Sequence, residues 1–315
     1  DSPWLPGWHG DTILDYYSSE QCWINANLKA VNQFPEIIVL PGFWSEFGMC
    51  TEPSAFGAPM VWFENDLPHA SKLDLSIEKL AAIKKPDVRQ DGLLPFVIKR
   101  LSHQRNAIEA AGHKIRFAVS RGPLNIATFL MGTTEFMMAT AMHREQITAL
   151  LEMITDFIID WIRWQKQHFG DIQGLLLLDD LMGFLSEDDF RELAVPYFKS
   201  IYDAVDFPVR FLHNDAFGLT TAKYLNEIGV NLFNFGFEHS LQDMKDLTVN
   251  KVTLLGNIPP RDVLASGSPA DVKAAVHAMQ SSVRDHSRII WSCGGGMPPG
   301  VPTANIDAFM KAINT

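Results

Sequence analysis

Basic residues are scarce in this 315-residue chain, which has 26 Lys and Arg against 37 Asp and Glu and a formal net charge of −11. Nucleic-acid binding usually needs a basic surface, so this balance argues against a nucleic-acid partner. No apolar run reaches the roughly 18 residues that span a bilayer, and the first residues lack a basic segment followed by an apolar one. We therefore expect neither membrane insertion nor export.

Cysteine is scarce as well. Cys22, Cys50 and Cys293 are an odd number spread far apart, which argues against a disulfide framework and favours a reducing compartment. We therefore expect a cytoplasmic protein. The chain does not begin with Met and its first ten residues show no regular periodicity, which raises the hypothesis of a truncated N-terminus.

Apolar residues, by contrast, are plentiful: 47% of the chain is hydrophobic and 20% is charged, which is typical of a globular protein with a large core. No repeat, low-complexity tract or flexible linker divides the sequence, so we expect one domain over residues 1–315. Short apolar runs rich in β-forming residues occur along its length. They cover residues 37–40, 59–65, 114–120, 175–180, 209–215, 232–237, 252–257 and 289–294.

Helical patterns separate most of these runs. The clearest covers residues 142–169, where apolar residues recur at three and four residue steps. Ser186, before three acidic residues, and Ser268, before Pro269, predict the starts of two more helices. Strands alternating with helices predict an α/β fold with a parallel sheet, and about eight strands favour a single (β/α)8 TIM barrel.

Two alternatives remain at this point. An open doubly wound sheet also alternates strands and helices, but the chain has neither GxGxxG after its first strand nor GxxxxGK[ST], the usual nucleotide-binding fingerprints of such sheets. The run at 59–65 also suits a hairpin in the loop before a helix at 72–84.

In a barrel the active site lies at the C-terminal ends of the strands, and there the sequence is polar. His213 and Asp215 are two residues apart on one strand, so both side chains leave the same face. We predict that His213, Asp215 and Asp179 are catalytic. The predicted substrate-binding residues are Trp44, Glu46, Glu52, Arg121, Asn214, Asn257 and Gly295.

Each candidate also has a structural interpretation. Asp179 and Asp180 suit the capping of a helix, and a lone His213 is more often a hydrogen-bonded core residue. Cys293 suits a small buried hydrophobe, and Arg121 suits a pairing with an acidic neighbour. Single aromatic residues such as Trp44 more often belong to the core.

Four ordered segments resemble the uroporphyrinogen decarboxylase superfamily, which includes cobalamin-linked methyltransferases. They cover residues 115–132, 177–205, 254–264 and 294–313. The resemblance implies a TIM barrel and a homodimer, and for the decarboxylases the removal of acetate carboxyl groups from a tetrapyrrole without a cofactor. This chain departs from that pattern: the "RQAGRY" motif is absent, Pro41 stands where the family has an aspartate, and Gly295 matches the histidine of "GHG".

The chain is more similar to the methyltransferase branch. That resemblance implies a zinc site of the form His-x-Cys with a distant Cys, here matched by His213, Asp215 and Cys293, and a corrinoid supplied by a partner protein. The match departs from the family at Asp215, which replaces a Cys, and at Cys293, which lies about two residues early if the C-terminal prolines set the register, with Gly295 in the ligand position.

The hypothesis from the sequence is thus a corrinoid-dependent methyltransferase or demethylase acting on a small methoxy-aromatic, methylamine or thiol compound. Without zinc, His213, Asp215, Asp179 and Glu46 are candidate proton donors to a departing group. Two alternatives stay open: a tetrapyrrole decarboxylase and a catalytically inert ligand-binding barrel.

Overall fold

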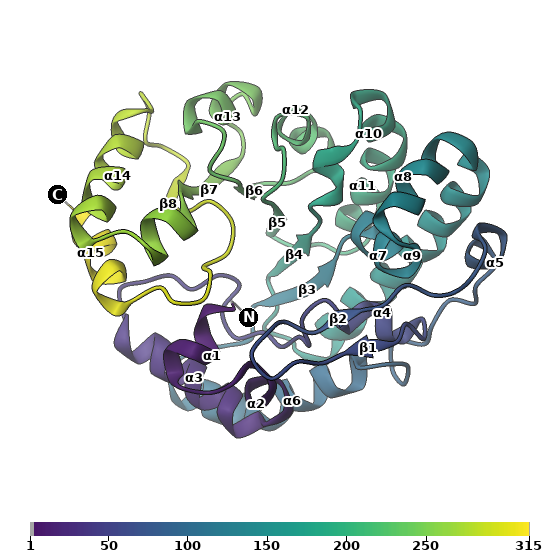
Figure 1. Ribbon diagram of the computed structural model, residues 1–315, viewed down its shortest axis with the longest axis horizontal. Helices are drawn as coiled ribbons and strands as arrows, with labels where there is room; N and C mark the ends of the chain where they lie inside the picture. Colours follow the sequence, from purple (N-terminus) through teal and green to yellow (C-terminus); the bar gives the residue numbers. More distant parts are fainter. Residues whose placement is uncertain (1–2, 315) are drawn as a thin grey trace.

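Six parallel strands form the central sheet of the computed structural model, which describes residues 3–314 (Figure 1). They are hydrogen-bonded in chain order from β3 to β8. A doubly wound sheet reverses its strand order, so this unbroken order excludes that alternative. The strands are β3 (Phe117–Arg121), β4 (Gly174–Leu178), β5 (Val209–Asn214), β6 (Leu232–Phe235), β7 (Thr253–Ile258) and β8 (Ile289–Cys293).

The sheet curves around an apolar interior of its own. Every one of the six strands contributes a side chain to one inner cluster, which is distinct from the larger core between sheet and helices. The rings of Phe117 on β3 and Phe211 on β5 lie 6.4 Å apart although β4 runs between them, where strand spacing in a flat sheet would be about 10 Å. Figure 1 shows the strands around a common centre with the helices outside. The predicted parallel α/β barrel fold is confirmed, with six and not eight strands in the sheet of the described residues.

The leucines of β4 illustrate why such strands read as continuous apolar runs. Leu176 packs in the inner cluster, whereas Leu175 and Leu177 pack in the outer core against the helices. Both faces of the strand are therefore buried, as expected for a parallel barrel strand. Each fully buried leucine stabilises the fold by about 1.5–3 kcal/mol.

The first two predicted strands are not part of the sheet. Residues 37–40 form no strand, yet Leu40 and Trp44 pack against the inner cluster, so this segment covers the barrel where β8 and β3 are not paired. Of residues 59–65 only Met60–Val61 (β1) is a strand, paired antiparallel with His69–Ala70 (β2). The hairpin alternative is thus confirmed for this run.

Helix positions follow the sequence signals closely. The long helix α9 (Arg144–His168) buries its predicted apolar stripe. Ser186 caps α10 (Glu187–Leu193) by accepting from the backbone N–H of Asp189, and Ser268 forms a capping box with Asp271 on α14 (Pro269–Ser281). The predicted helix at 72–84 is shorter, with only α5 (Ile77–Ala81) formed.

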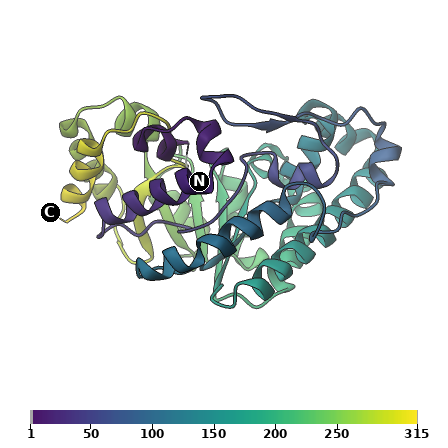
Figure 2. The same ribbon diagram turned by 90° about the horizontal axis from the view of Figure 1, so that it is seen from below.

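The N-terminal helices pack beside the C-terminal part of the chain (Figure 2). The indole N–H groups of Trp4 and Trp8 donate to the Val301 carbonyl and the Thr303 hydroxyl at 2.9 and 3.0 Å. The remaining helices are α1 (Trp4–His9), α2 (Ile13–Ser18), α3 (Glu20–Gln33), α4 (Thr51–Ala55), α6 (Leu94–Ala110), α7 (Pro123–Met131), α8 (Thr133–Met142), η1 (Leu181–Phe184), α11 (Val195–Asp203), α12 (Leu219–Ile228), α13 (Leu241–Leu247), η2 (Pro260–Ala265) and α15 (Thr303–Ile313).

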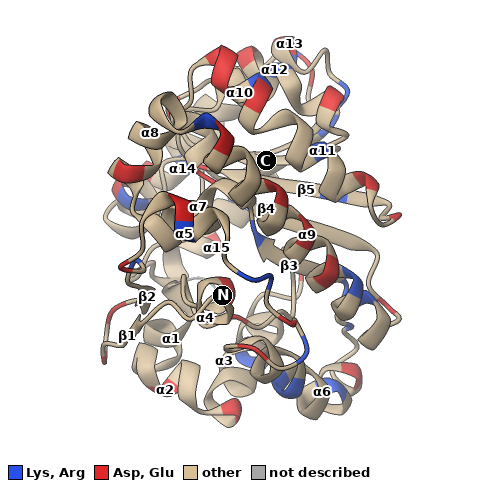
Figure 3. Cartoon of the chain, turned by 90° about the vertical axis from the view of Figure 1, so that its right-hand side faces the viewer, with Lys and Arg blue, Asp and Glu red and all other residues tan. Residues whose placement is uncertain are grey.

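Charged residues lie mostly on the outer helices, with both signs interspersed on the side shown in Figure 3. Within residues 3–314, no helix combines the length and the apolar character needed to cross a bilayer.

Candidate functional site

The barrel interior changes from apolar to polar towards the C-terminal ends of the strands. Leu178, His213, Asn234, Leu255 and Ile290 are successive partners in the register from β4 to β8 and form one row. Three of the five are aliphatic, and the two polar members, on β5 and β6, are adjacent. Strand side chains alternate with a period of two, so the next inward positions along β4 and β5 fall at residues 180 and 215.

Those positions hold Asp180 and Asp215, which meet His213 in a cluster at the mouth of the barrel. The Nε2 atom of His213 lies 4.0 Å from an Asp180 carboxylate oxygen and 3.9 Å from one of Asp215. The backbone N–H of Asp215 donates to Asp180 at 3.1 Å. One ligand atom from each residue lies within 4.8 Å of the other two, so these three side chains are able to hold a metal ion. The predicted pair of His213 and Asp215 is brought together, and Asp180 is its new third member.

Two neighbouring carboxylates at the edge of a barrel do not ionise independently. Partial burial, the negative charge of Asp180 and a hydrogen bond with that carboxyl group raise the pKa of Asp215, while His213 opposes the shift. The cluster therefore favours either a retained proton or a bound cation, since both relieve the repulsion between the carboxylates.

Asp179, which is next to Asp180 and was predicted to be catalytic, points away from the mouth of the barrel. Its carboxylate is fully buried behind β4 and accepts from the backbone N–H groups of Leu124, Asn125 and Leu181 at 2.9–3.1 Å. It thus caps α7, the structural alternative left open by the sequence. Gly122 fits tightly here, because a Cβ atom at that position would lie 2.4 Å from the carboxylate. The structure corrects the placement of Asp179 in the mouth because residue 180, and not 179, faces inwards.

Cys293 is not a member of the cluster either. It is buried in the outer core, and its thiol donates to the Gly295 carbonyl at 3.3 Å. Its strand neighbour Ser292 has the inward register position, opposite Asn257 of β7. The predicted metal set of His213, Asp215 and Cys293 is therefore corrected at its third member, which is Asp180.

A second polar group lies on the other side of the mouth, around Arg121 at the end of β3. Its guanidinium donates to Glu46 at 2.6 Å, and its backbone N–H donates to Glu52 at 3.0 Å. Burial raises the pKa of Glu52, although the positive charge of Arg121 opposes this shift. Trp44 lies close by in chain order and packs against the inner cluster. Three predicted substrate-binding residues, Glu46, Glu52 and Arg121, thus form one network. This network borders the His213 cluster, because the negative charge of Asp180 acts on Arg121 and favours its charged form.

We expect Arg121→Leu to lower the free energy of unfolding by about 3–5 kcal/mol. Glu46 and Arg121 are only 8% and 14% exposed, and removal of one partner leaves a buried charge uncompensated. Urea unfolding measures the loss. The double variant Arg121→Leu with Glu46→Leu should recover most of it, and a double variant as unstable as the single one would show that the two charges do not depend on each other.

The remaining predicted residues have different placements. Asn214 faces away from the mouth, donating to Thr221 and accepting from the backbone of Ala216. Asn257 donates to the His239 carbonyl at 2.6 Å and so holds the loop after β6. Gly295 has φ +89°, and a Cβ there would lie 2.7 Å from the Asp215 carboxylate, so this residue directly borders the cluster.

Sequence reasoning missed Asp180 as a member of the cluster, and it missed Asn234 altogether. The missing information was the facing of β4, because its four consecutive leucines give no amphipathic signal. Asn234 offered a weaker signal, as the one polar residue within the four-residue strand β6.

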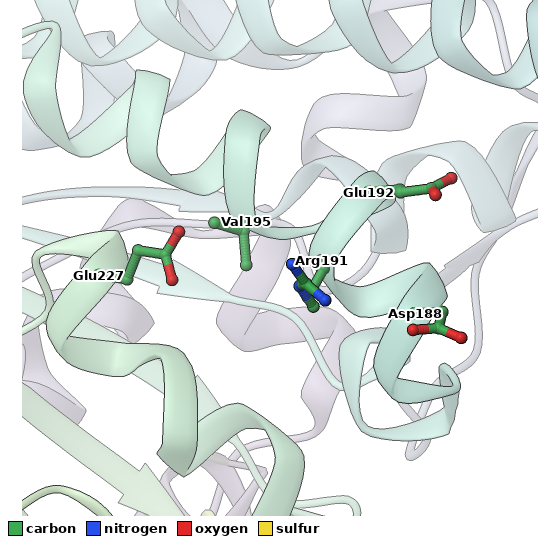
Figure 4. Close-up of a pocket in the computed structure, with 5 residues that line it drawn as sticks. All are labelled: Asp188, Arg191, Glu192, Val195 and Glu227. Atoms are coloured by element: carbon green, nitrogen blue, oxygen red, sulfur yellow. The ribbon is translucent and has the colours of Figure 1, made fainter.

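A surface cavity of about 300 Å³ lies elsewhere, among the outer helices α10 to α12 (Figure 4). Asp188, Arg191, Glu192, Val195 and Glu227 line it, and Figure 4 shows Glu227 across the hollow from Asp188 and Glu192. None of the residues discussed above lines this cavity.

Together, the fold and the site define a class. Imidazole and carboxylate groups converge at the C-terminal strand ends of a parallel α/β barrel, which is where enzymes of this architecture carry their active sites. The family follows from comparison: the chain belongs to the uroporphyrinogen decarboxylase (URO-D) family, whose model matches residues 9–315.

Individual relatives are distant. The chain is 24% identical to a uroporphyrinogen decarboxylase of Alcanivorax borkumensis, over 97% of this chain and 86% of that protein. Its fold is similar to that of a methyltransferase from Methanosarcina mazei, with a TM-score of 0.80, 17% identity and coverage of 98% and 89%. A B12-independent methionine synthase from Shewanella sp. W3-18-1 is similar with a TM-score of 0.56 and 10% identity, covering 94% and 89%.

Proposed function

We propose that this protein is a corrinoid-dependent methyltransferase or demethylase, which moves a methyl group between a small methyl compound and a corrinoid supplied by a partner protein. The observation that carries the proposal is the convergence of His213, Asp180 and Asp215 at the mouth, a set suited to proton transfer or to metal binding. The methyltransferase of similar fold agrees with this choice but adds only the likeness of the fold.

The same region is poorly suited to a tetrapyrrole with many carboxylate groups. Such a substrate needs cationic partners, and the guanidinium within this mouth, that of Arg121, is already paired with Glu46. Asp180 and Asp215 add negative charge beside it. Pro41, in place of the family's aspartate, supplies no side-chain acceptor for pyrrole N–H groups. Decarboxylation remains the second candidate because the curated relatives carry that name.

The donor set fits a divalent metal. One imidazole nitrogen and two carboxylates suit zinc, iron or manganese, whereas the absence of a thiolate from the cluster differs from the sulfur-rich zinc site that the resemblance implied. When bound, such an ion supplies Lewis acidity to an acceptor or a departing group. Asp180, His213 and Asp215 would hold it, with Gly295 leaving the adjacent space free of a side chain.

The residues also support acid catalysis by themselves. A departing alkoxide or phenoxide must be protonated at neutral pH, and burial and the charge of Asp180, which raise the pKa of Asp215, favour this carboxyl group as the proton donor. His213 lies within 4 Å and connects Asp215 with Asp180. The two groups together are able to hold and pass one proton at the mouth.

Metal content is the first test. We expect about one divalent ion per chain in protein purified without chelators or a metal-binding tag, measured by elemental analysis. Asp180→Asn and His213→Ala should each lose the ion, because each removes one of three ligands. Asp188→Asn, in the acidic surface cavity, is the matched control and should keep it.

The activity assay then separates the candidate reactions. We expect methyl transfer between free cobalamin and either a thiol or a methoxyaromatic compound, followed by the corrinoid absorbance. Turnover of uroporphyrinogen without any corrinoid reaction would overturn the proposal in favour of decarboxylation. Absence of every turnover would favour an inert binding barrel.

A further inference from the structure

We propose that Asn234 is a positioning residue that fixes the tautomer of His213, so that Nδ1 carries the proton and Nε2 presents its lone pair to Asp180 and Asp215. Asn234 lies on β6 beside His213 in the register and is 4% exposed. The inference concerns the state of the imidazole in the resting protein. Only its consequence for methyl transfer rests on the proposed function.

The orientation of the Asn234 amide follows from its neighbours. Its Nδ2 atom donates to the Leu255 carbonyl at 2.8 Å and to the Cys293 carbonyl at 3.4 Å. Backbone carbonyl oxygens only accept hydrogen bonds. A flipped amide would place its own oxygen against these two oxygens and would lose both bonds, so the NH2 group must face β7 and β8.

Consequently, the amide oxygen faces His213. The distance from Oδ1 of Asn234 to Nδ1 of His213 is 2.7 Å. An amide oxygen cannot donate, so the bond forms only when Nδ1 carries the hydrogen. In the neutral ring the other nitrogen, Nε2, is then without a proton, and it is the atom that faces Asp180 and Asp215 at 4.0 and 3.9 Å.

The position of Asn234 argues against a purely structural role. The neighbours of Asn234 and His213 in this row, Leu178 on β4 and Leu255 and Ile290 on β7 and β8, are aliphatic, and a leucine at position 234 would avoid the cost of burying an amide. Asn305 on α15 offers a comparison. It also donates from Nδ2 to two carbonyls, those of Leu264 and Gly267, at 2.8 Å each, but its Oδ1 has no hydrogen-bond partner.

This arrangement prepares His213 for either role of the cluster. An imidazole that ligates a metal through Nε2 commonly donates its Nδ1 proton to an oxygen, which fixes the ring and raises its basicity. The same tautomer makes Nε2 the atom that takes up a proton from Asp215 or from a substrate.

The test reads the tautomer directly. In protein labelled with ¹⁵N-histidine and freed of metal, two-bond proton–nitrogen correlation at pH 8 should show His213 with a protonated Nδ1 and a bare Nε2. The signal is identified by its loss in His213→Gln. Asn234→Leu removes the acceptor opposite Nδ1 and should give a mixture of both tautomers. Asn305→Leu, which loses two similar carbonyl bonds and no bond to His213, should leave the His213 signal unchanged.

A second measurement gives the size of the effect. Asn234→Leu should weaken Zn²⁺ binding about 10–100-fold in a chelator competition, the usual cost of removing a partner that orients a ligand. A wild-type spectrum with a protonated Nε2 would overturn the inference even if Asn234→Leu failed to fold. Because the spectrum requires neither metal nor turnover, failure of the proposed function would leave this result intact, and the reverse also holds.

Discussion

Replacement of His213 by Ala should abolish activity while leaving the fold intact. His213 is the centre of the cluster, within 4.0 Å of both Asp180 and Asp215, and loss of a general acid or base costs about 10²–10⁴ in rate. We expect kcat for methyl transfer to fall by at least about 100-fold. His213 borders the mouth and is not part of the apolar core, so the variant should fold, with a loss of stability of about 1–3 kcal/mol because Oδ1 of the buried Asn234 loses its partner.

The control for this variant is a histidine remote from the mouth. His277 is exposed on the outer helix α14, and His277→Ala should retain full activity. Full activity with unchanged KM in His213→Ala would remove the cluster from the mechanism altogether. Loss of the circular dichroism signal in that variant would instead show that His213 is structural.

The second large effect is on stability, at Asp179. This carboxyl group accepts three backbone hydrogen bonds while fully buried. In Asp179→Ala these buried N–H groups lose their partner, so the free energy of unfolding should fall by about 2–4 kcal/mol in urea unfolding at pH 5. A variant as stable as the wild type would contradict the capping role.

The same residue makes stability depend on pH. Burial raises the pKa of Asp179 to about 8, although its N–H donors favour the ionised form. The unfolded chain releases this proton near pH 4, so between about pH 4 and pH 8 the folded state binds more protons than the unfolded state. The contribution of Asp179 is therefore complete below pH 4 and is lost as the pH rises to about 8.

Urea unfolding of wild type and Asp179→Ala at pH 5, 6.5 and 8 checks the sign. The difference between the two proteins should be largest at pH 5 and should shrink towards pH 8. A difference that grows as the pH rises would indicate that Asp179 is ionised in the folded protein.

Helices were the more predictable part of the fold. The apolar stripe of α9 and the caps of α10 and α14 depend on residues close in sequence, and all three were confirmed. The prediction of a strand at 37–40 was wrong, because an apolar composition also suits a segment without strand partners. Ile38 and Val39 are 74% and 44% exposed there, so strand formation was decided by pairing with distant residues, which composition does not encode.

By itself, the sequence determined that His213 and Asp215 share one face of a strand, because strand geometry has a period of two. It also determined that polar groups follow the strands of a parallel barrel, at the edge where active sites form. Which face of each strand points inwards was decided only by the tertiary structure. The four leucines of β4 suit both faces equally, so the register with β5 chose Asp180 for the mouth and Asp179 for the cap of α7. The register of β8 with β7 likewise placed the Cys293 side chain in the outer core.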